Sequence, residues 1–494
     1  MIKRLLVANR GEIALRVIAA CRELGIESVA IFSEPDRHAR HVLAADRAVA
    51  VGPAAPSESY LNARAILDAA RSSGADAVHP GYGFLSENAD FAARCEQASV
   101  VFVGPPASVL RQLGSKIQAR RLMHAAGVPV VPGETPTSQS DDGLAAALKR
   151  VGFPALVKAA AGGGGKGMRL VSSANEAAAA IQAARREALA SFGDATLYVE
   201  RLLERPRHIE VQIFGDVHGS IVHLFERDCS IQRRHQKVIE ESPAPSIGPR
   251  LRDRLLSTAV RAASAAEYRN AGTVEFLVDQ RAGSPEDAPF FFLEMNTRLQ
   301  VEHPVTEQIT GRDLVLAQLL VASGQPLPWL QNQILPRGCA IEARVYAEDP
   351  ANDFLPQAGR MLLYREPKVP GIRIDSGVTE GDDVSVHYDP LIAKVIATAE
   401  TRELTIARLA AALRAYPILG IRTNVAFLLR VIESDAFRTG NVDTAFLDTE
   451  GASWAHEEPA DIPGHVRAAL RAHEAKSDQV SVPDPWARSR SWRP

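Results

Sequence analysis

The pattern of apolar and polar residues over the first hundred positions predicts strands and helices that alternate along the chain. Apolar runs at 4–8 and 28–32 predict strands, and the amphipathic stretch 13–24 between them predicts a helix that Gly25 ends. Four more segments continue the pattern: helices near 60–72 and 86–97, and strands at 77–78 and 100–103. This order predicts an α/β fold that begins with a Rossmann-like parallel sheet covered by helices.

Two further units are predicted after Gly114. The second contains a strand, a glycine loop and a strand at 153–171, and the third begins near 337 with a half-buried strand at 340–347. The same patterns predict helices at 115–126, 175–190 and 402–415, and strands near 195–200, 208–214, 219–226, 272–279, 290–300 and 391–397. Past about 450 the chain holds one predicted helix near 462–475 and a polar tail.

Length and composition are those of a globular enzyme. The 494 residues suffice for about three domains, with 46% hydrophobic and 23% charged residues. A net charge of -3 gives no field that would attract nucleic acid, and no apolar run reaches membrane-spanning length. The four cysteines form no Cys-x-x-Cys pair, which argues against a zinc site or a disulfide framework. With no signal peptide, we expect a cytoplasmic protein without a nucleic-acid or membrane partner.

The most informative polar pattern lies at 294–302, directly after the apolar run 290–293. If this segment is extended, one face carries every second side chain: Glu294, Asn296, Arg298, Gln300 and Glu302. Acids and an arginine that leave a buried strand are costly unless they are compensated. A divalent metal with polyphosphate would compensate the acids, and a small anion would compensate the arginine. The alternative is an edge strand with a solvated face.

The segment 158–168 is a glycine loop between two predicted strands. It contains Gly-x-Gly-x-x-Gly from Gly162, but a strand follows it, whereas a dinucleotide site needs a helix. Lys166 is followed by glycine, so the Ser or Thr of a Walker A loop is missing. The pattern favours a β-hairpin whose backbone amides approach phosphates, with Lys158 and Lys166 at its rim. A flexible hairpin tip is the alternative.

Other polar clusters favour a metal and an anion site. Glu275 lies in an apolar strand, and we expect it to face Glu294 across a hairpin with Asn296 close by, a donor set that suits Mg²⁺. A single acid paired with an arginine is the alternative. The segment 227–241 is dense in hydrogen-bond donors and could equally be a solvated basic loop.

Together these segments resemble biotin carboxylase, the ATP-grasp component of biotin-dependent carboxylases. The resemblance runs from residue 1 to about 450 and is carried by the glycine loop and by the motifs at 8–14, 79–88, 227–237 and 294–304. It implies an N-terminal biotin carboxylase domain, an ATP-grasp domain with a mobile Gly-rich lid, a C-terminal biotin carboxylase domain and a tail. The implied limits are 1–114, 115–334 (lid about 131–203), 335–446 and 447–494.

The resemblance also implies a role for each matching residue. The nucleotide site would consist of Lys116, Lys158, Gly164, Gly165, Glu200, Arg201, Leu202, Leu203, His208, Gln232 and His235. The ATP-bound Mg²⁺ (or Mn²⁺), expected as two ions, would be held by Glu275, Glu294 and Asn296. Bicarbonate would be held by Lys237, Arg298, Gln300 and the Val301 backbone. Glu302 would be the general base, and Arg344 would stabilise the biotin enolate.

The implied reaction makes carboxyphosphate from bicarbonate and ATP, and then carboxybiotin. The side chains suit it, because a carboxylate can deprotonate bicarbonate and cations can stabilise the developing charge. Ala161 stands where the family often has glycine, and Lys166 where it often has arginine. We expect these two departures to change lid dynamics without abolishing activity.

Biotin and the later steps are expected to come from partners. No lysine in the sequence has a neighbouring methionine, which the family's biotin-attachment motif requires, so carrier and carboxyltransferase are expected on other polypeptides. A homodimer is a family expectation, and the tail after 450 either docks partners or is a disordered end. The motifs at 376–378 and 388–391 favour an acyl-CoA acceptor, such as acetyl-CoA in fatty acid synthesis, over pyruvate or urea. Another ATP-grasp ligase of purine or carbamoyl-phosphate type, and a non-catalytic nucleotide-binding subunit, are the competing hypotheses.

Overall fold

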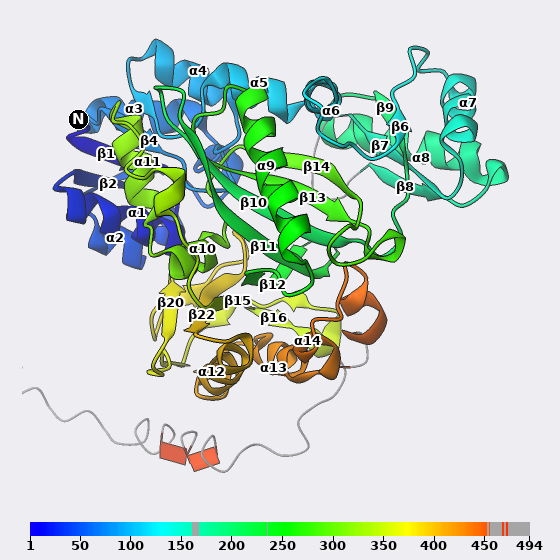
Figure 1. Ribbon diagram of the computed structural model, residues 1–494. Helices are drawn as coiled ribbons and strands as arrows, with labels where there is room; N and C mark the ends of the chain where they lie inside the picture. The colour runs from blue at the N-terminus through cyan, green and yellow to red at the C-terminus, as the bar shows by residue number, and fades with distance from the viewer. Residues whose placement is uncertain (161–166, 235, 452–453, 455–466, 469–470, 473–494) are drawn as a thin grey trace, which may run out of the picture.

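The computed structural model describes residues 1–160, 167–234, 236–451, 454, 467–468 and 471–472. In this part of the chain the three largest sheets have five, eight and four strands (Figure 1). None of the helices in it is long and apolar enough to cross a membrane. Ala161, Lys166 and most of the helix expected near 462–475 lie outside the described residues.

The N-terminal sheet is parallel and has the order β3-β2-β1-β4-β5. Its strands are β1 (Arg4–Val7), β2 (Glu27–Ser33), β3 (Arg47–Gly52), β4 (Ala77–His79) and β5 (Val101–Phe102). The helices that accompany them include α1 (Gly11–Leu24), α3 (Ala63–Ser73) and α4 (Ala89–Gln97). Gly25 ends α1 with a left-handed φ of 68°, a conformation that glycine adopts without strain. The predicted parallel sheet is confirmed, whereas β3 was not predicted.

The loops after β1 and β4 leave the same edge of this sheet. The chain continues from β1 in one direction and from β4 in the other, so a crevice opens between the two loops. Asn9 bridges them, because its side-chain amide donates to the backbone oxygens of Pro80 and Tyr82, both at 2.7 Å. A crevice of this kind is a frequent ligand site in α/β proteins.

The glycine loop belongs to a small lobe at the right of Figure 1. Its sheet has the order β6-β9-β7-β8 and contains β6 (Gly133–Glu134), β9 (Leu197–Arg201), β7 (Ala155–Ala159) and β8 (Met168–Val171). The helices α7 (Asp141–Val151) and α8 (Ala177–Phe192) pack on it. β7 and β8 pair antiparallel, which confirms the predicted hairpin, although the loop residues 161–166 lie outside the described part.

An eight-stranded antiparallel sheet forms the centre of the molecule and has the order β14-β13-β10-β11-β12-β15-β22-β20. Its strands are β10 (Arg207–Gly215), β11 (Ile221–Arg233), β12 (Gln236–Ser242), β13 (Asn270–Val278), β14 (Phe290–Asn296), β15 (Cys339–Tyr346), β20 (Ile372–Ser376) and β22 (Leu391–Ala399). The strands from the third predicted unit therefore extend the sheet of the second, through the pairing of β12 with β15. Helices α6 (Lys116–Ala125), α9 (Pro249–Ala265), α10 (His303–Thr310), α11 (Leu314–Ala322), α12 (Arg402–Arg414) and α13 (Val425–Glu433) surround it.

A strand does form at the position predicted near 340–347, but the prediction that it is half-buried is wrong. The seven residues of β15 after Cys339 are all buried, because α12 and α13 cover one side of the strand and α10 packs against it as well. The solvated loop considered for 227–241 is also wrong. That segment forms β11 and β12, and the Arg227 side chain is completely buried.

The extended segment predicted through 300 is shorter than expected. β14 ends at Asn296, because the next backbone N–H, that of Thr297, donates to the Glu87 carboxylate at 3.0 Å instead of continuing the ladder. β14 is an edge strand, as the alternative interpretation had it, but Glu294 and Asn296 are half-buried rather than solvated. Arg298, Gln300 and Glu302 therefore reach the site from a loop and not from a strand face.

Replacing His223 on β11 by phenylalanine is expected to reduce the acid sensitivity of the fold. Burial lowers the pKa of His223 to about 4, against a smaller opposite effect of Asp253, so the folded state holds it neutral. A lowered histidine pKa gives stability above the unfolded value near 6.5 that is lost as pH falls toward 4. The wild-type free energy of unfolding should fall by about 1–2 kcal/mol more than that of the variant between pH 6.5 and 4, measured by urea denaturation. A free energy of unfolding that falls by the same amount in both proteins between pH 6.5 and 4 would contradict this prediction.

Candidate active site

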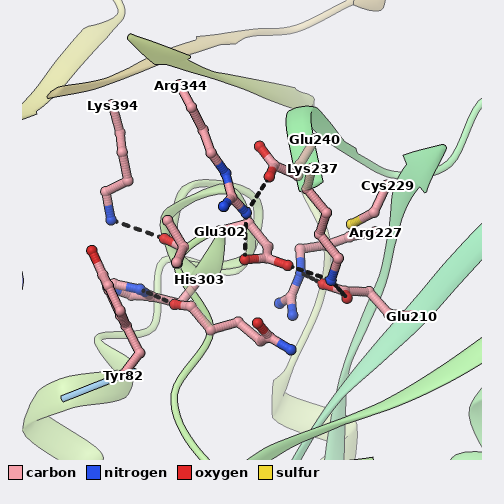
Figure 2. A network of polar contacts seen from close by, with 12 residues as sticks. Tyr82, Glu210, Arg227, Cys229, Lys237, Glu240, Glu302, His303, Arg344 and Lys394 are labelled. Atoms are coloured by element: carbon pink, nitrogen blue, oxygen red, sulfur yellow. Dashed lines mark hydrogen bonds and ion pairs between the residues drawn. The ribbon is translucent and has the colours of Figure 1, made fainter. Parts of the chain in front are cut away.

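Lys237 on β12 is the centre of a buried cluster of carboxylates (Figure 2). Its ammonium group lies 2.7 Å from Glu302 and 2.8 Å from Glu275, and it also pairs with Glu210. Burial acts to lower the pKa of Lys237, but these three carboxylates raise it well above its ordinary value. The cluster therefore keeps a permanent positive charge where three strands and one loop meet.

Glu302 is fully buried and lies between two cations. One carboxylate oxygen accepts from Lys237 and the other accepts from Arg344 at 3.0 Å. Burial acts to raise the pKa of Glu302, but Lys237 and then Arg344 lower it, so the group is ionised at neutral pH. An ionised carboxylate fixed by two cations can accept a proton from a substrate held beside it.

The turn that carries Glu302 is fixed by the start of α10. Pro304 occupies the first turn of this helix, where its missing N–H costs nothing. The Nδ1 atom of His303 lies 2.8 Å from the carbonyl oxygen of Gln300 (Figure 2). This contact closes a loop of four residues, 300–303, beneath the carboxylate.

Glu275 and Glu294 face each other across β13 and β14, as predicted from their positions. The Asn296 amide donates to Glu275 at 2.6 Å, and His208 lies 2.8 Å from the other Glu275 oxygen. Burial and the neighbouring Glu275 raise the pKa of Glu294, while Lys237 and His208 hold the pKa of Glu275 low against its own burial. Two acids that oppose each other in this way, with an amide oxygen at hand, fit a divalent cation such as Mg²⁺.

Two of the lysines expected at the nucleotide, Lys116 and Lys158, lie near Glu200 on β9. Lys158 lies 2.9 Å from Glu200, and Arg120 on α6 lies 2.7 Å from its other oxygen. Burial lowers the pKa of Lys116, and Glu294 is its main opposing charge. Sequence reasoning missed Arg120, although its position four residues after Lys116 on one helix places the two on the same face.

The structure describes some of the other residues expected at the nucleotide and leaves three of them out. Gln232 contacts the Nδ1 atom of His208 and donates to the Cys229 carbonyl at 2.9 Å. The backbone N–H groups of Arg201 and Leu202 donate to Pro132 and Pro154, and Leu203 is buried. Gly164, Gly165 and His235 lie outside the described residues.

Arg298 and Gln300 join the acid cluster to the N-terminal unit. The Arg298 guanidinium donates to Gln300 at 3.0 Å and to Glu87 at 3.2 Å, and the Gln300 amide approaches Glu275 at 3.4 Å. Sequence reasoning gave Glu87 no role, although it lies in the motif at 79–88. It also missed Glu210 and Arg227, which pair with each other in the buried cluster. Glu210 is an acid in an apolar strand, the same signal that identified Glu275.

A cavity of about 400 Å³ opens beside Arg344, between the N-terminal crevice and the large sheet. Its lining consists of Asn9, Arg10, Gly11, Glu12, Ile13, Tyr82, Gly83, Phe84, Gln236, Arg298, Val301, Arg344, Tyr346, Tyr388, Asp389 and Leu391. The three arginines in this lining suit an anion or a developing negative charge, and the aromatic rings suit an organic ring. Glu302 is linked to this cavity through Arg344 and to Glu275 of the acid pair through Lys237, so a small anion beside it could meet both.

Comparison with known proteins gives one consistent family. Three family models match: "Biotin carboxylase, N-terminal domain" at residues 1–110, "Carbamoyl-phosphate synthase L chain, ATP binding domain" at 115–330, and "Biotin carboxylase C-terminal domain" at 342–449. The methylcrotonoyl-CoA carboxylase subunit alpha, mitochondrial, of Rattus norvegicus is 51% identical over 447 residues, which cover 90% of this chain and 62% of that protein. Biotin carboxylase 2 of Bacillus subtilis (strain 168) is 48% identical over 447 residues, which cover 90% of this chain and 99% of that protein.

A solved structure gives the same result. The biotin carboxylase domain dimer of the Hydrogenobacter thermophilus 2-oxoglutarate carboxylase, in complex with MgADP, ADP and bicarbonate, superposes with a TM-score of 0.88. It is 42% identical, and the match covers 93% of this chain and 100% of that chain. The chain thus spans 62% of the length of the rat relative and nearly all of the Bacillus subtilis protein.

Proposed function

This chain belongs to the biotin carboxylase family of ATP-dependent ligases, and on that premise we propose that it carboxylates carrier-bound biotin with bicarbonate for an acyl-CoA carboxylase. One observation supports the first half-reaction most directly. Glu302, an ionised buried carboxylate, is linked to Glu275 of the acid pair through Lys237 and to the cavity through Arg344. A base in that position can act on bicarbonate between ATP and biotin.

The substrates ATP and biotin and the cofactor Mg²⁺ are those of the family, and we assign each a place. ATP lies against Lys116, Lys158, Gly164, Gly165, His208, Gln232 and His235, with its adenine at Glu200, Arg201, Leu202 and Leu203. Glu275, Glu294 and Asn296 hold Mg²⁺, which neutralises charge on the phosphates. Bicarbonate binds to Lys237, Arg298, Gln300 and the Val301 backbone. Biotin occupies the cavity beside Arg344.

The proposed chemistry has two steps. Glu302 takes the proton of bicarbonate, whose oxygen attacks the γ-phosphorus of ATP as the bond to ADP breaks, which gives carboxyphosphate. Lys237 and Arg298 stabilise the negative charge that develops on the transferred group. Carboxyphosphate then breaks down to CO₂ and phosphate, and phosphate takes the proton of the biotin ureido nitrogen. Arg344 stabilises the resulting enolate, which attacks CO₂ and gives carboxybiotin.

We also propose the domain limits and the partners. The limits are 1–114, 115–334 with a lid at about 131–203, 335–446, and a tail at 447–494. A biotin carrier and a carboxyltransferase act with this chain, which forms a homodimer, as the Hydrogenobacter thermophilus domain does. The acceptor is an acyl-CoA. The 51% identity to a methylcrotonoyl-CoA carboxylase subunit makes 3-methylcrotonoyl-CoA the first candidate, ahead of acetyl-CoA, pyruvate and urea.

The half-reaction is tested by ADP release from Mg-ATP, with and without bicarbonate and free biotin. Release that requires bicarbonate and increases with biotin is the expected result. Release that is indifferent to both would contradict the proposal and favour another ATP-grasp ligase. The acceptor is tested separately, by the transfer of labelled bicarbonate to each candidate acyl-CoA in the presence of carrier and transferase.

A further inference from the structure

Lys394 on β22 is a completely buried cation that the reaction described above does not use. Its ammonium group donates to the carbonyl oxygen of Val301 at 2.8 Å (Figure 2) and pairs with Glu12 at 3.1 Å. Asp375 lies further away, at 3.7 Å. A fully buried lysine is costly to the fold unless its partners compensate it, and an apolar side chain would fill the same volume at less cost.

The partners of Lys394 come from all three units of the chain. Glu12 is on α1, Val301 is in the loop before α10, and Lys394 itself is on β22. The Tyr82 hydroxyl donates to the same Glu12 oxygen, and Glu12, Tyr82 and Val301 all line the 400 Å³ cavity. One ammonium group therefore connects the wall of the cavity to the loop that carries the base.

The hydrogen bond from Lys394 to Val301 also constrains the backbone of the next residue, Glu302. The Val301 carbonyl belongs to the peptide group that joins Val301 to Glu302, and a peptide group is planar. Fixing that carbonyl therefore fixes the direction in which the Glu302 backbone continues. On the other side of the turn, His303 contacts the Gln300 carbonyl at 2.8 Å. The two contacts hold the four-residue turn from opposite ends.

We propose that Lys394 is a positioning residue for the carboxylation reaction. It holds the Val301–Glu302 peptide against the wall formed by Glu12 and Tyr82, so that the base and the biotin cavity keep one fixed separation. The inference rests on the proposed function, in which Val301 and Glu302 meet bicarbonate and the cavity receives biotin. Because the Val301 backbone and Glu302 both meet bicarbonate there, a residue that fixes this peptide should have a measurable effect on the KM for bicarbonate.

The test compares the full chain with the variants Lys394→Met and Lys394→Met/Glu12→Gln. The single variant leaves Glu12 without its cation, so we expect it to unfold at a lower temperature, and the double variant to regain part of that loss. In both variants the KM for bicarbonate should rise about tenfold, while the KM for ATP stays within about twofold, because one charged hydrogen bond to the bicarbonate loop is lost. If the single variant does not fold, the KM for bicarbonate of the double variant alone tests the inference.

Arg402→Met is the matched control. Arg402 also pairs with a buried acid, Glu241 at 2.6 Å, and donates to the carbonyl oxygens of Phe437 and Arg438, far from the cavity. We expect the Arg402→Met substitution to lower the unfolding temperature and to leave the KM for bicarbonate unchanged. A double variant whose bicarbonate KM returns to the wild-type value together with its unfolding temperature would overturn the inference, as would a Lys394→Met variant with wild-type KM. Wild-type ATP turnover that needs no bicarbonate would instead overturn the proposed function.

Discussion

Replacing Glu302 by glutamine is expected to lower bicarbonate-dependent ATP turnover by about three orders of magnitude. A general base contributes about 10²–10⁴ to a rate, and the amide cannot accept the bicarbonate proton. Glu302 is also the partner of Lys237 and Arg344, so the variant loses the anion that orients both cations. The measurement is steady-state ADP release at saturating Mg-ATP and bicarbonate, with biotin present.

The control for this variant is Glu348→Gln. Glu348 is another buried acid with an arginine partner, Arg233 at 3.2 Å, but neither residue lines the cavity. Its turnover should stay within about threefold of the wild type. ATP affinity of Glu302→Gln should also be unchanged, because the expected nucleotide contacts lie elsewhere. A loss of less than tenfold in turnover would show that another group removes the proton.

Replacing Arg344 by methionine is expected to separate the two halves of the reaction. Carboxybiotin formation should fall at least about a hundredfold, because the enolate loses the guanidinium that stabilises its charge. Bicarbonate-dependent ATP turnover without biotin should persist within about tenfold, because Lys237 still holds Glu302 ionised. Both quantities can be followed in one assay, as ADP release with and without biotin and as trapped labelled carboxybiotin.

The stability of this variant should depend on pH. Arg344 pairs with Glu240 as well as Glu302, and burial raises the pKa of Glu240 to about 7, against the opposing effect of Arg344. At pH 6 Glu240 is therefore mostly protonated in the wild type and needs no cation, whereas at pH 8 it is ionised and loses its partner with Arg344, so the destabilisation at pH 6 should be smaller than at pH 8. Arg233→Met, which removes an arginine from Glu348 outside the cavity, is the matched control for stability.

For the activity of Arg344→Met, an equal loss of ATP turnover and of carboxybiotin formation would show that Arg344 acts mainly on Glu302.

The sequence predicted the acid pair and the hairpin because both follow from local patterns. Glu275 and Glu294 each interrupt an apolar strand, and strand alternation places them face to face. The same reasoning failed at Arg298 and Glu302, because Glu87 captures the backbone N–H of Thr297 and ends the strand early. That hydrogen bond crosses 210 residues, and no local pattern contains it.

The cluster around Lys394 shows the second limit of sequence reasoning. Lys394 follows a strand entry at 388–391, where a buried lysine gives no signal beyond its position. Its partners Glu12 and Val301 lie in other units of the chain, and even the nearer one, Val301, is 93 residues away. Only the packing of three units against one another brings these groups together. Burial on both sides of β15 has the same origin, because α10 and α12 come from different units.

The pairing of β12 with β15 has a consequence for how the molecule can be divided. Residues 239–242 pair with residues 340–343, across the limit proposed at 334 and 335. A fragment cut at that limit would expose a row of unpaired backbone groups on the strand that carries Lys237, an edge prone to join another chain. The ATP-grasp and C-terminal regions therefore share one sheet, and we expect neither to fold normally when the chain is cut between 334 and 335.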